Sequence, residues 1–138
     1  MNFVVIITDD DPVTIFLHSK VVAHSELSND PLRFSSGQET LDYLNKHHED
    51  GKTYLILLDI NMPGMNGWQL LDAISQQSYS DRIYTLMVSS SIDLIDHKRA
   101  IAHKQVIGYL EKPITEKAIR EIRKSAAFEE ILKNLSLN

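Results

Sequence analysis

The 138-residue sequence contains no cysteine, which excludes disulfides, thiolate metal ligands and cysteine nucleophiles. It also has no apolar stretch long enough to cross a membrane. The first apolar run, Phe3 to Ile7, is only five residues long, ends in acidic residues and has no basic flank, unlike a signal peptide. We therefore expect a cytoplasmic protein that does not enter a membrane.

Positive charge is scarce, because 14 basic residues face 19 acidic ones and give a net charge of −5. Nucleic-acid binding depends on Lys and Arg neutralising phosphates, so we expect no direct contact with DNA or RNA. Up to Asp81 the chain carries 4 basic and 12 acidic residues (−8), and the remainder carries 10 and 7 (+3). Ordinary scatter on solvated helices explains this asymmetry slightly better than a partner surface on the C-terminal third.

Only five glycines are present, and neither of the glycine-rich phosphate loops G-x-G-x-x-G and G-x-x-x-x-G-K-[ST] occurs, which argues against a nucleotide-binding enzyme. The six histidines form no metal motif, so we expect them to be exposed to solvent. No linker, repeat or low-complexity tract divides the sequence. Its length and its 43% apolar content suit one folded domain over residues 1–138.

Short apolar runs alternate with segments of helical spacing. Four runs are apolar almost throughout, as in strands buried on both faces of a parallel sheet: Phe3–Ile7, Tyr54–Leu58, Tyr84–Val88 and Val106–Leu110. A weaker fifth strand is predicted at Leu32–Ser35. Helices are predicted over Pro12–Ala23, Gln38–His48, Trp68–Gln77, Asp93–Lys104 and Glu116–Leu135. This alternation predicts an α/β fold with an open, doubly wound parallel sheet of five strands.

In the Pro12–Ala23 helix, the apolar residues at helical spacing are Val13, Phe16, Leu17 and Val21. The last helix changes the phase of its apolar residues between Ala126 and Phe128. That change allows a continued core helix with a new face or a small dimer contact, and we favour the former. We expect a monomer or a weak dimer.

Polar residues follow the apolar runs, and the carboxyl ends of parallel strands meet at one edge of a sheet. The residues in these positions are Thr8 to Asp11, Asp59, Ser89 and Glu111 to Pro113. We expect them to converge on one site.

Three consecutive aspartates follow the first strand. Asp11 precedes Pro12 and is predicted to cap a helix, which leaves Asp9 and Asp10 unexplained. If both face Asp59, charges about 4 Å apart repel by roughly 4 kcal/mol per pair at an effective dielectric near 20. An all-oxygen site that needs neutralising favours a hard divalent cation such as Mg²⁺.

Asp59 follows a strongly apolar strand, which suggests a nucleophile toward a phosphoryl donor. A second capping or turn aspartate is the alternative, and the nearby Asp9 and Asp10 favour the first interpretation. Phosphoryl transfer needs charge neutralisation at the transferred oxygens. Lys112 supplies a positive charge and Ser89 a hydroxyl donor at the same predicted edge.

Four segments in this order and spacing resemble the receiver domain of bacterial two-component response regulators, most closely the small single-domain, chemotaxis-type regulators. They are Thr8–Pro12, Leu57–Gly67, Met87–Ser91 and Gly108–Pro113. The resemblance covers nearly the whole chain. It implies a (βα)₅ flavodoxin-like fold with strand order 2-1-3-4-5, an arrangement for which the chemotaxis member is a standard example.

The resemblance also implies roles for the residues of the predicted site. Asp59 would accept the phosphoryl group, and Asp10 and Asp59 would bind Mg²⁺ directly. Asn61 would add its backbone carbonyl, and Asp9 would act largely through a metal-bound water. Lys112 would contact the phosphoryl group and precede a cis peptide bond.

Ser89 and Tyr109 match the family's switch pair, although a partly buried core aromatic is a serious alternative for Tyr109. The phosphoryl donor would be a histidine kinase or a phosphotransfer protein. The downstream protein would bind the face built from the fourth helix, the last strand and the fifth helix. Gln105-Val106 and Ser90 depart from the common family pattern, which is Gly-Ala and alanine at these positions.

We therefore expect a stand-alone phosphoacceptor domain that catalyses only its own phosphorylation and dephosphorylation. Two alternatives remain open: a receiver-like scaffold that works without phosphorylation, and a Mg²⁺-dependent aspartyl-phosphate phosphatase of the haloacid-dehalogenase type. The full set of site residues argues against the scaffold. The phosphatase places its nucleophile after the first strand in an Asp-x-Asp motif, whereas the isolated aspartate here follows the central strand.

Overall fold

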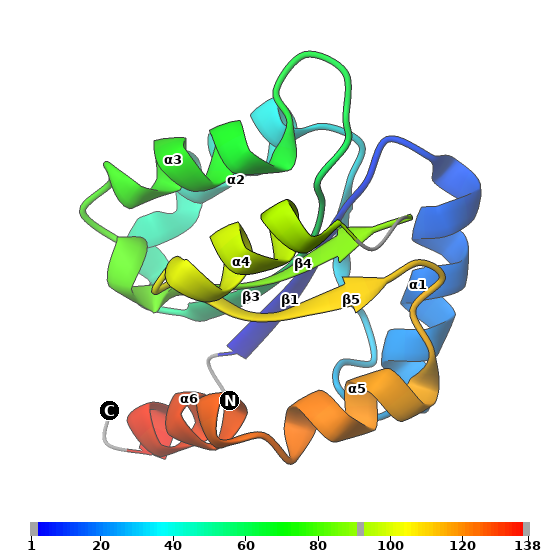
Figure 1. Cartoon of the computed structure of the whole chain (residues 1–138). Helices are drawn as coiled ribbons and strands as arrows, with labels where there is room; N and C mark the ends of the chain where they lie inside the picture. The colour runs from blue at the N-terminus through cyan, green and yellow to red at the C-terminus, as the bar shows by residue number, and fades with distance from the viewer. Residues whose placement is uncertain (1–2, 91–92, 137–138) are drawn as a thin grey trace.

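The structure is a computed structural model that describes residues 3–90 and 93–136, with side chains up to residue 133 (Figure 1). The described part contains five strands: β1 (Phe3–Thr8), β2 (Leu32–Phe34), β3 (Thr53–Asp59), β4 (Ile83–Ser89) and β5 (Val106–Glu111). It contains six α-helices: α1 (Pro12–His24), α2 (Gly37–His47), α3 (Gly67–Ser75), α4 (Leu94–Ala102), α5 (Glu116–Arg123) and α6 (Ala126–Ser136).

The five strands form one parallel sheet in the order β2-β1-β3-β4-β5, which confirms the predicted fold and strand order. All seven residues of the central strand β3 are buried, as expected for a strand covered on both faces. The predicted strand boundaries differ from the observed ones by one residue at most.

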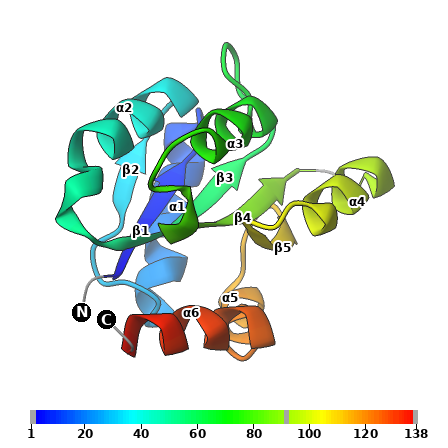
Figure 2. The ribbon, with the colours of Figure 1, turned by 90° about the vertical axis from the view of Figure 1, so that its left-hand side faces the viewer.

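Alternate residues of the strands supply two separate cores because successive side chains point to opposite faces of a sheet. Ile56 and Leu58 of β3 pack with residues of α2 and α3, including Leu44 and Leu71. The neighbouring β3 residues belong to the second core, under α1, α5 and α6. Figure 2 shows these two helix layers on either side of the sheet.

The helix starts follow from local hydrogen bonding. The carboxylate of Asp11 accepts a 3.0 Å hydrogen bond from the backbone N–H of Val13, and Pro12 occupies the first turn, which confirms the predicted cap. Asn66 and Gln69 form a reciprocal capping box at the start of α3.

None of the helices in the described part of the chain has both the length and the apolar character of a membrane span.

Helix α1 forms as predicted, but most of its apolar residues do not face the core. Val13, Phe16 and Leu17 are 63%, 59% and 48% exposed, whereas His18 and Val22 are buried. The apolar residues that predicted the helix therefore do not all mark its buried face. The buried residues of α1 are His18, Ser19 and Val22, and the helix packs against β1 and α5.

The prediction of a single helix over Glu116–Leu135 is wrong. The chain forms two helices there, with a break at residues 124–125. The hydroxyl of Ser125 accepts a 3.2 Å hydrogen bond from the backbone N–H of Phe128 at the start of α6. Phe128 then meets Phe3 edge-on, with ring centroids 6.1 Å apart. The phase change between Ala126 and Phe128 thus marks a new helix that covers the second core.

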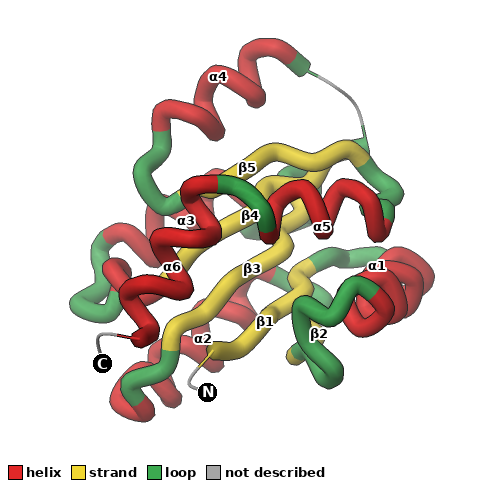
Figure 3. The backbone as a smooth tube through the Cα atoms, turned by 90° about the horizontal axis from the view of Figure 1, so that it is seen from below, coloured by secondary structure: helices red, strands yellow, loops and turns green. Residues whose placement is uncertain are grey.

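Helix α4 lies at the β5 edge of the sheet, set apart from the other helices (Figure 3). Ala100 is its only buried residue. Two further contacts attach the helix. His97 stacks on Tyr109 of β5 with ring centroids 5.4 Å apart, and the guanidinium of Arg99 lies 4.4 Å from the ring centroid of Trp68 on α3. The large apolar residues of α4 are exposed: Leu94, Ile95 and Ile101.

Candidate functional site

The polar residues predicted to converge do so because the strand register aligns their carboxyl ends. Thr8 of β1 pairs with Leu58, and Val88 of β4 pairs with Asp59. The backbone N–H of Lys112 donates a 2.8 Å hydrogen bond to the carbonyl oxygen of Ser89. Four neighbouring segments therefore end side by side at one edge of the sheet.

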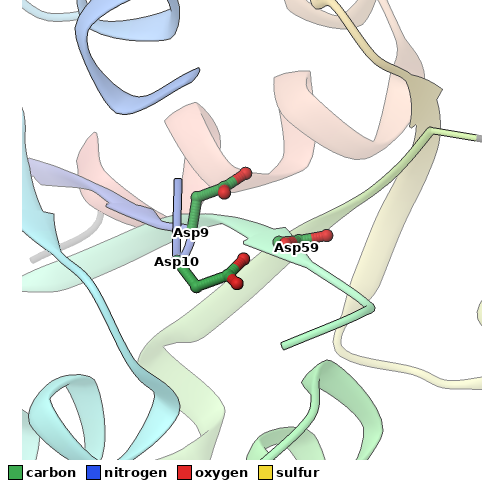
Figure 4. A group of neighbouring side chains, drawn as sticks. All are labelled: Asp9, Asp10 and Asp59. Atoms are coloured by element: carbon green, nitrogen blue, oxygen red, sulfur yellow. The ribbon is translucent and has the colours of Figure 1, made fainter. Parts of the chain in front are cut away.

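Three carboxylates meet at this edge. One carboxylate oxygen from each of Asp9, Asp10 and Asp59 lies within 4.8 Å of the other two. Figure 4 shows Asp9 and Asp10 extending toward Asp59 from the end of β1. Asp9 and Asp59 are buried, whereas Asp10 is exposed.

Lys112 is the positive charge within the carboxylate cluster. Its Nζ lies 2.7 Å from Oδ2 of Asp9 and 3.2 Å from Oδ1 of Asp59. The peptide bond between Lys112 and Pro113 is cis, as the family resemblance implies. The cluster has three carboxylates and one ammonium, so it keeps an excess of negative charge.

The excess negative charge of the cluster affects the pKa of Asp59. Burial, followed by the charge of Asp9, raises the pKa of Asp59 from 3.8 to about 6, although Lys112 opposes the shift. Burial alone would lower the pKa of Lys112, but its hydrogen bonds and ion pairs with Asp9 and Asp59 raise it. Lys112 therefore stays protonated, and Asp59 has the carboxylate whose charge is least well compensated.

The hydrogen bonds distinguish Asp59 from Asp9. Asp9 uses both oxygens: Oδ1 accepts from the backbone N–H of Asp11 at 2.9 Å, and Oδ2 pairs with Lys112. For Asp59, Oδ1 contacts Lys112 and accepts a 3.2 Å hydrogen bond from the backbone N–H of Asn61. Within the described residues no hydrogen bond or ion pair reaches Oδ2 of Asp59. That oxygen is therefore free to bond an incoming group.

The other predicted site residues differ in exposure and in surroundings. Ser89 is fully buried at the end of β4, beside the residue paired with Asp59. Asn61 is exposed in the loop after β3. Tyr109 is partly buried against the first core and stacks on His97. Ser91, part of the segment that resembled the family, lies outside the described residues.

Gly67 holds the loop after Asp59 close to the sheet. Its backbone N–H donates a 2.9 Å hydrogen bond to the carbonyl oxygen of Ile60. A Cβ at this position would lie 2.7 Å from the backbone oxygen of Asp59. The close approach requires glycine, so Gly67 fixes the position of the Asp59 backbone.

His18 was not expected at the site, since the sequence suggested exposed histidines. It is 2% exposed, and its Nε2 accepts a 3.1 Å hydrogen bond from the backbone N–H of Ile114. Burial lowers the pKa of His18 and keeps the ring neutral, as an acceptor must be. His18 thereby attaches α1 to the loop that carries Lys112. The only sequence signal was its helical spacing with Val22, which is too common to be informative.

Comparison with known proteins agrees with this geometry. The response regulator receiver domain family matches residues 5–124. The transcriptional regulatory protein MalR of Bacillus subtilis is 35% identical over 111 residues, covering 79% of this chain and 43% of MalR. The chain thus spans less than half the length of that curated relative.

Solved structures show the same likeness over most of both chains. A two-component response regulator from Cytophaga hutchinsonii has a TM-score of 0.83 and 29% identity, covering 95% of this chain and 97% of that one. A response regulator receiver protein from Dyadobacter fermentans has a TM-score of 0.77 and 30% identity, covering 88% and 95%. The fold and the site define a signalling receiver domain. The chain belongs to the response regulator receiver domain family.

Proposed function

We propose that residues 1–138 form one phosphoacceptor domain, in which Asp59 receives a phosphoryl group. Receiver domains are partnered by histidine kinases or phosphotransfer proteins, and the donor here is the phosphohistidine of such a protein. An oxygen of Asp59 attacks phosphorus, the P–N bond of the donor breaks, and the electron pair returns to the donor imidazole. The product is an acyl phosphate on Asp59.

The observation that carries the proposal is the free Oδ2 of Asp59 inside a carboxylate cluster. Asp9 is the less suitable nucleophile in this arrangement, because each of its oxygens already has a hydrogen-bond or ion-pair partner. Asp59 is held through Oδ1 by Lys112 and Asn61, which positions Oδ2 for attack.

The same cluster fits Mg²⁺, because its donors are all oxygen and it carries more negative than positive charge. We assign Asp10 and Asp59 as direct ligands, with the backbone carbonyl of Asn61 as a third and Asp9 acting through a water. When bound, the ion would neutralise charge on the transferred oxygens. Lys112 would hold one of those oxygens, and the Ser89 hydroxyl another.

Phosphorylation would then act on α4 through Ser89 and Tyr109. A group with about −1.5 to −2 charges at pH 7 draws the Ser89 hydroxyl toward it, and the Tyr109 ring turns inward. That motion would break the stack with His97, one of the few contacts that attach α4. The downstream partner would bind the face formed by α4, β5 and α5, and we expect the chain to act as a monomer or weak dimer in the cytoplasm.

Incubation with acetyl phosphate and Mg²⁺, followed by intact-mass measurement, tests this function. The wild type should gain one adduct of about 80 Da, which alkali removes, as expected for a single acyl phosphate. No adduct at all would favour the phosphorylation-independent scaffold. Release of many phosphate equivalents per protein would instead favour the aspartyl-phosphate phosphatase.

The raised pKa of Asp59 predicts that Mg²⁺ binding depends on pH. A proton and the ion compete for Asp59, so Mg²⁺ should bind weakly at pH 5 and more strongly as the pH rises through about 6. At a concentration about 100 times its Kd, Mg²⁺ would stabilise the fold by roughly 2.7 kcal/mol. Thermal unfolding at pH 5 and pH 8, with sodium chloride matched for ionic strength, checks this. Equal Mg²⁺-induced shifts at both values would contradict it.

A further inference from the structure

A groove lies along the flank of α1, on the side of the edge strand β2. Its volume is about 470 Å³, within the range of small-molecule sites. We call it the α1 groove, and the residues that matter are Ile15, Phe16, Ser19, Lys20, Asn29 and Arg33. None of the residues of the phosphoryl site lines it, so it is a separate feature of the molecule.

The α1 groove is positively charged, whereas the part of the chain that forms it is acidic. No Asp or Glu lines it, although residues 1–81 carry 12 acidic and only 4 basic residues. Two of those four basic residues, Lys20 and Arg33, lie in this one groove. Neither forms an ion pair with any carboxylate in residues 3–90 and 93–133. The groove is thus locally positive on an acidic half of the protein.

Arg33 is held in place rather than simply exposed. Its Nε donates a 2.8 Å hydrogen bond to the hydroxyl of Ser19, which is buried on α1. That hydroxyl in turn donates a 2.7 Å hydrogen bond to the carbonyl oxygen of Ile15. Because the contact uses only Nε, the two terminal nitrogens of the guanidinium remain for a planar anion such as a carboxylate.

An apolar surface lies next to these cations. Phe16 is 59% exposed, and the ammonium of Lys20 lies 4.9 Å from the centroid of its ring. Ile15, Pro12 and Ala23 add further apolar lining. An exposed aromatic ring is costly to leave in water and offers a stacking surface for a flat ligand.

We propose that the α1 groove binds a small organic anion that combines a carboxylate with an aromatic or similarly flat apolar body. Arg33 takes the carboxylate in a bidentate contact, Lys20 contributes the second positive charge, and the body lies against Phe16 and Ile15. The volume of the groove and its two unpaired cations favour a free small anion as its occupant. Nothing in this assignment depends on phosphorylation of Asp59.

A titration of the isotope-labelled chain with 2-naphthoate, followed by NMR of backbone amides, tests the proposal. Saturable shifts are expected at Ser19, Lys20 and Arg33. Arg33→Gln and Lys20→Gln should each weaken binding about tenfold or more, because each removes a charged partner. Lys46→Gln is the matched control, since Lys46 is an exposed lysine of the same acidic half but lies outside the groove, and it should leave binding unchanged.

The neutral analogue 2-naphthamide separates charge from apolar contact and should bind at least about tenfold more weakly. Lys20 makes no hydrogen bond with the described residues, whereas Arg33 does. Weaker binding by Lys20→Gln therefore cannot be attributed to a broken hydrogen bond in the fold. The absence of saturable shifts would overturn the proposal. So would affinities that are equal for the wild type and both variants, equal binding of the amide, or shifts confined to residues elsewhere.

Discussion

Replacing Asp59 with asparagine makes the Mg²⁺-free protein more stable and ends its uptake of a phosphoryl group. The gain in stability follows from the pKa of Asp59, which is about 6 in the fold and 3.8 for an ordinary aspartate in water. The protonated form of Asp59 therefore stabilises the fold relative to the ionised form. This stabilisation is complete below about pH 4 and is lost as the pH rises through about 6. Asparagine keeps the shape of the side chain without the charge.

This rise in the pKa corresponds to roughly 3 kcal/mol, so we expect Asp59→Asn to raise the free energy of unfolding by about 2–3 kcal/mol at pH 8. The advantage should fade toward pH 4, where Asp59 is already protonated in the folded wild type. Urea unfolding at both pH values, without Mg²⁺, measures it. Asp72→Asn, at an exposed position of α3, is the control and should change stability by less than about 0.5 kcal/mol. A less stable Asp59→Asn at pH 8 would contradict the account.

Lys112→Ala has the opposite effect on stability. It leaves Asp9 and Asp59 buried and facing each other without the ammonium that lies 2.7 Å and 3.2 Å from their oxygens. Breaking a buried ion pair costs about 3–5 kcal/mol, and protonation of Asp59 relieves part of that, so we expect a loss of about 3 kcal/mol at pH 8 without Mg²⁺. Saturating Mg²⁺ should restore much of it, because the ion supplies the missing positive charge.

Chemical unfolding of Lys112→Ala with and without Mg²⁺ checks this expectation. Lys117→Ala, which removes an exposed lysine from α5, is the matched control and should behave like the wild type in both conditions. Equal stability of Lys112→Ala and wild type without Mg²⁺ would mean that the ion pairs contribute little to the fold. The double variant with Asp59→Asn should lose less than Lys112→Ala alone, since only one buried carboxylate is then unpaired.

The sheet and the gathering of the site were predictable because both depend on patterns that are local in the sequence. The buried run before Asp59 indicates a central strand, and parallel strands bring their carboxyl ends together whatever the details of packing. The same rule placed Lys112 and Ser89 beside Asp59. The pattern did not predict which oxygens of Asp9 and Asp59 are already hydrogen-bonded. That difference depends on single hydrogen bonds from the backbone of Asp11 and of Asn61.

Other features depend on packing between distant segments and were missed. Phe16 is one of the apolar residues that predicted the first helix, but the buried side of α1 carries His18 and Val22. Spacing alone cannot tell which of two faces of a helix is covered when both carry apolar residues. The break before α6 was visible as a phase change at Ala126, but a Ser125 side-chain cap inside a helical pattern is too weak a signal to divide one helix into two.

The most direct test of the central claim is to find the phosphorylated residue. Treating the acetyl-phosphate-labelled protein with borohydride converts an aspartyl phosphate to homoserine, which peptide sequencing by mass spectrometry then locates. We predict conversion at Asp59 alone, dependent on Mg²⁺. Conversion at Asp9 or Asp10, or a phosphate on a serine that resists hydroxylamine, would contradict the assignment of Asp59 as the phosphoacceptor.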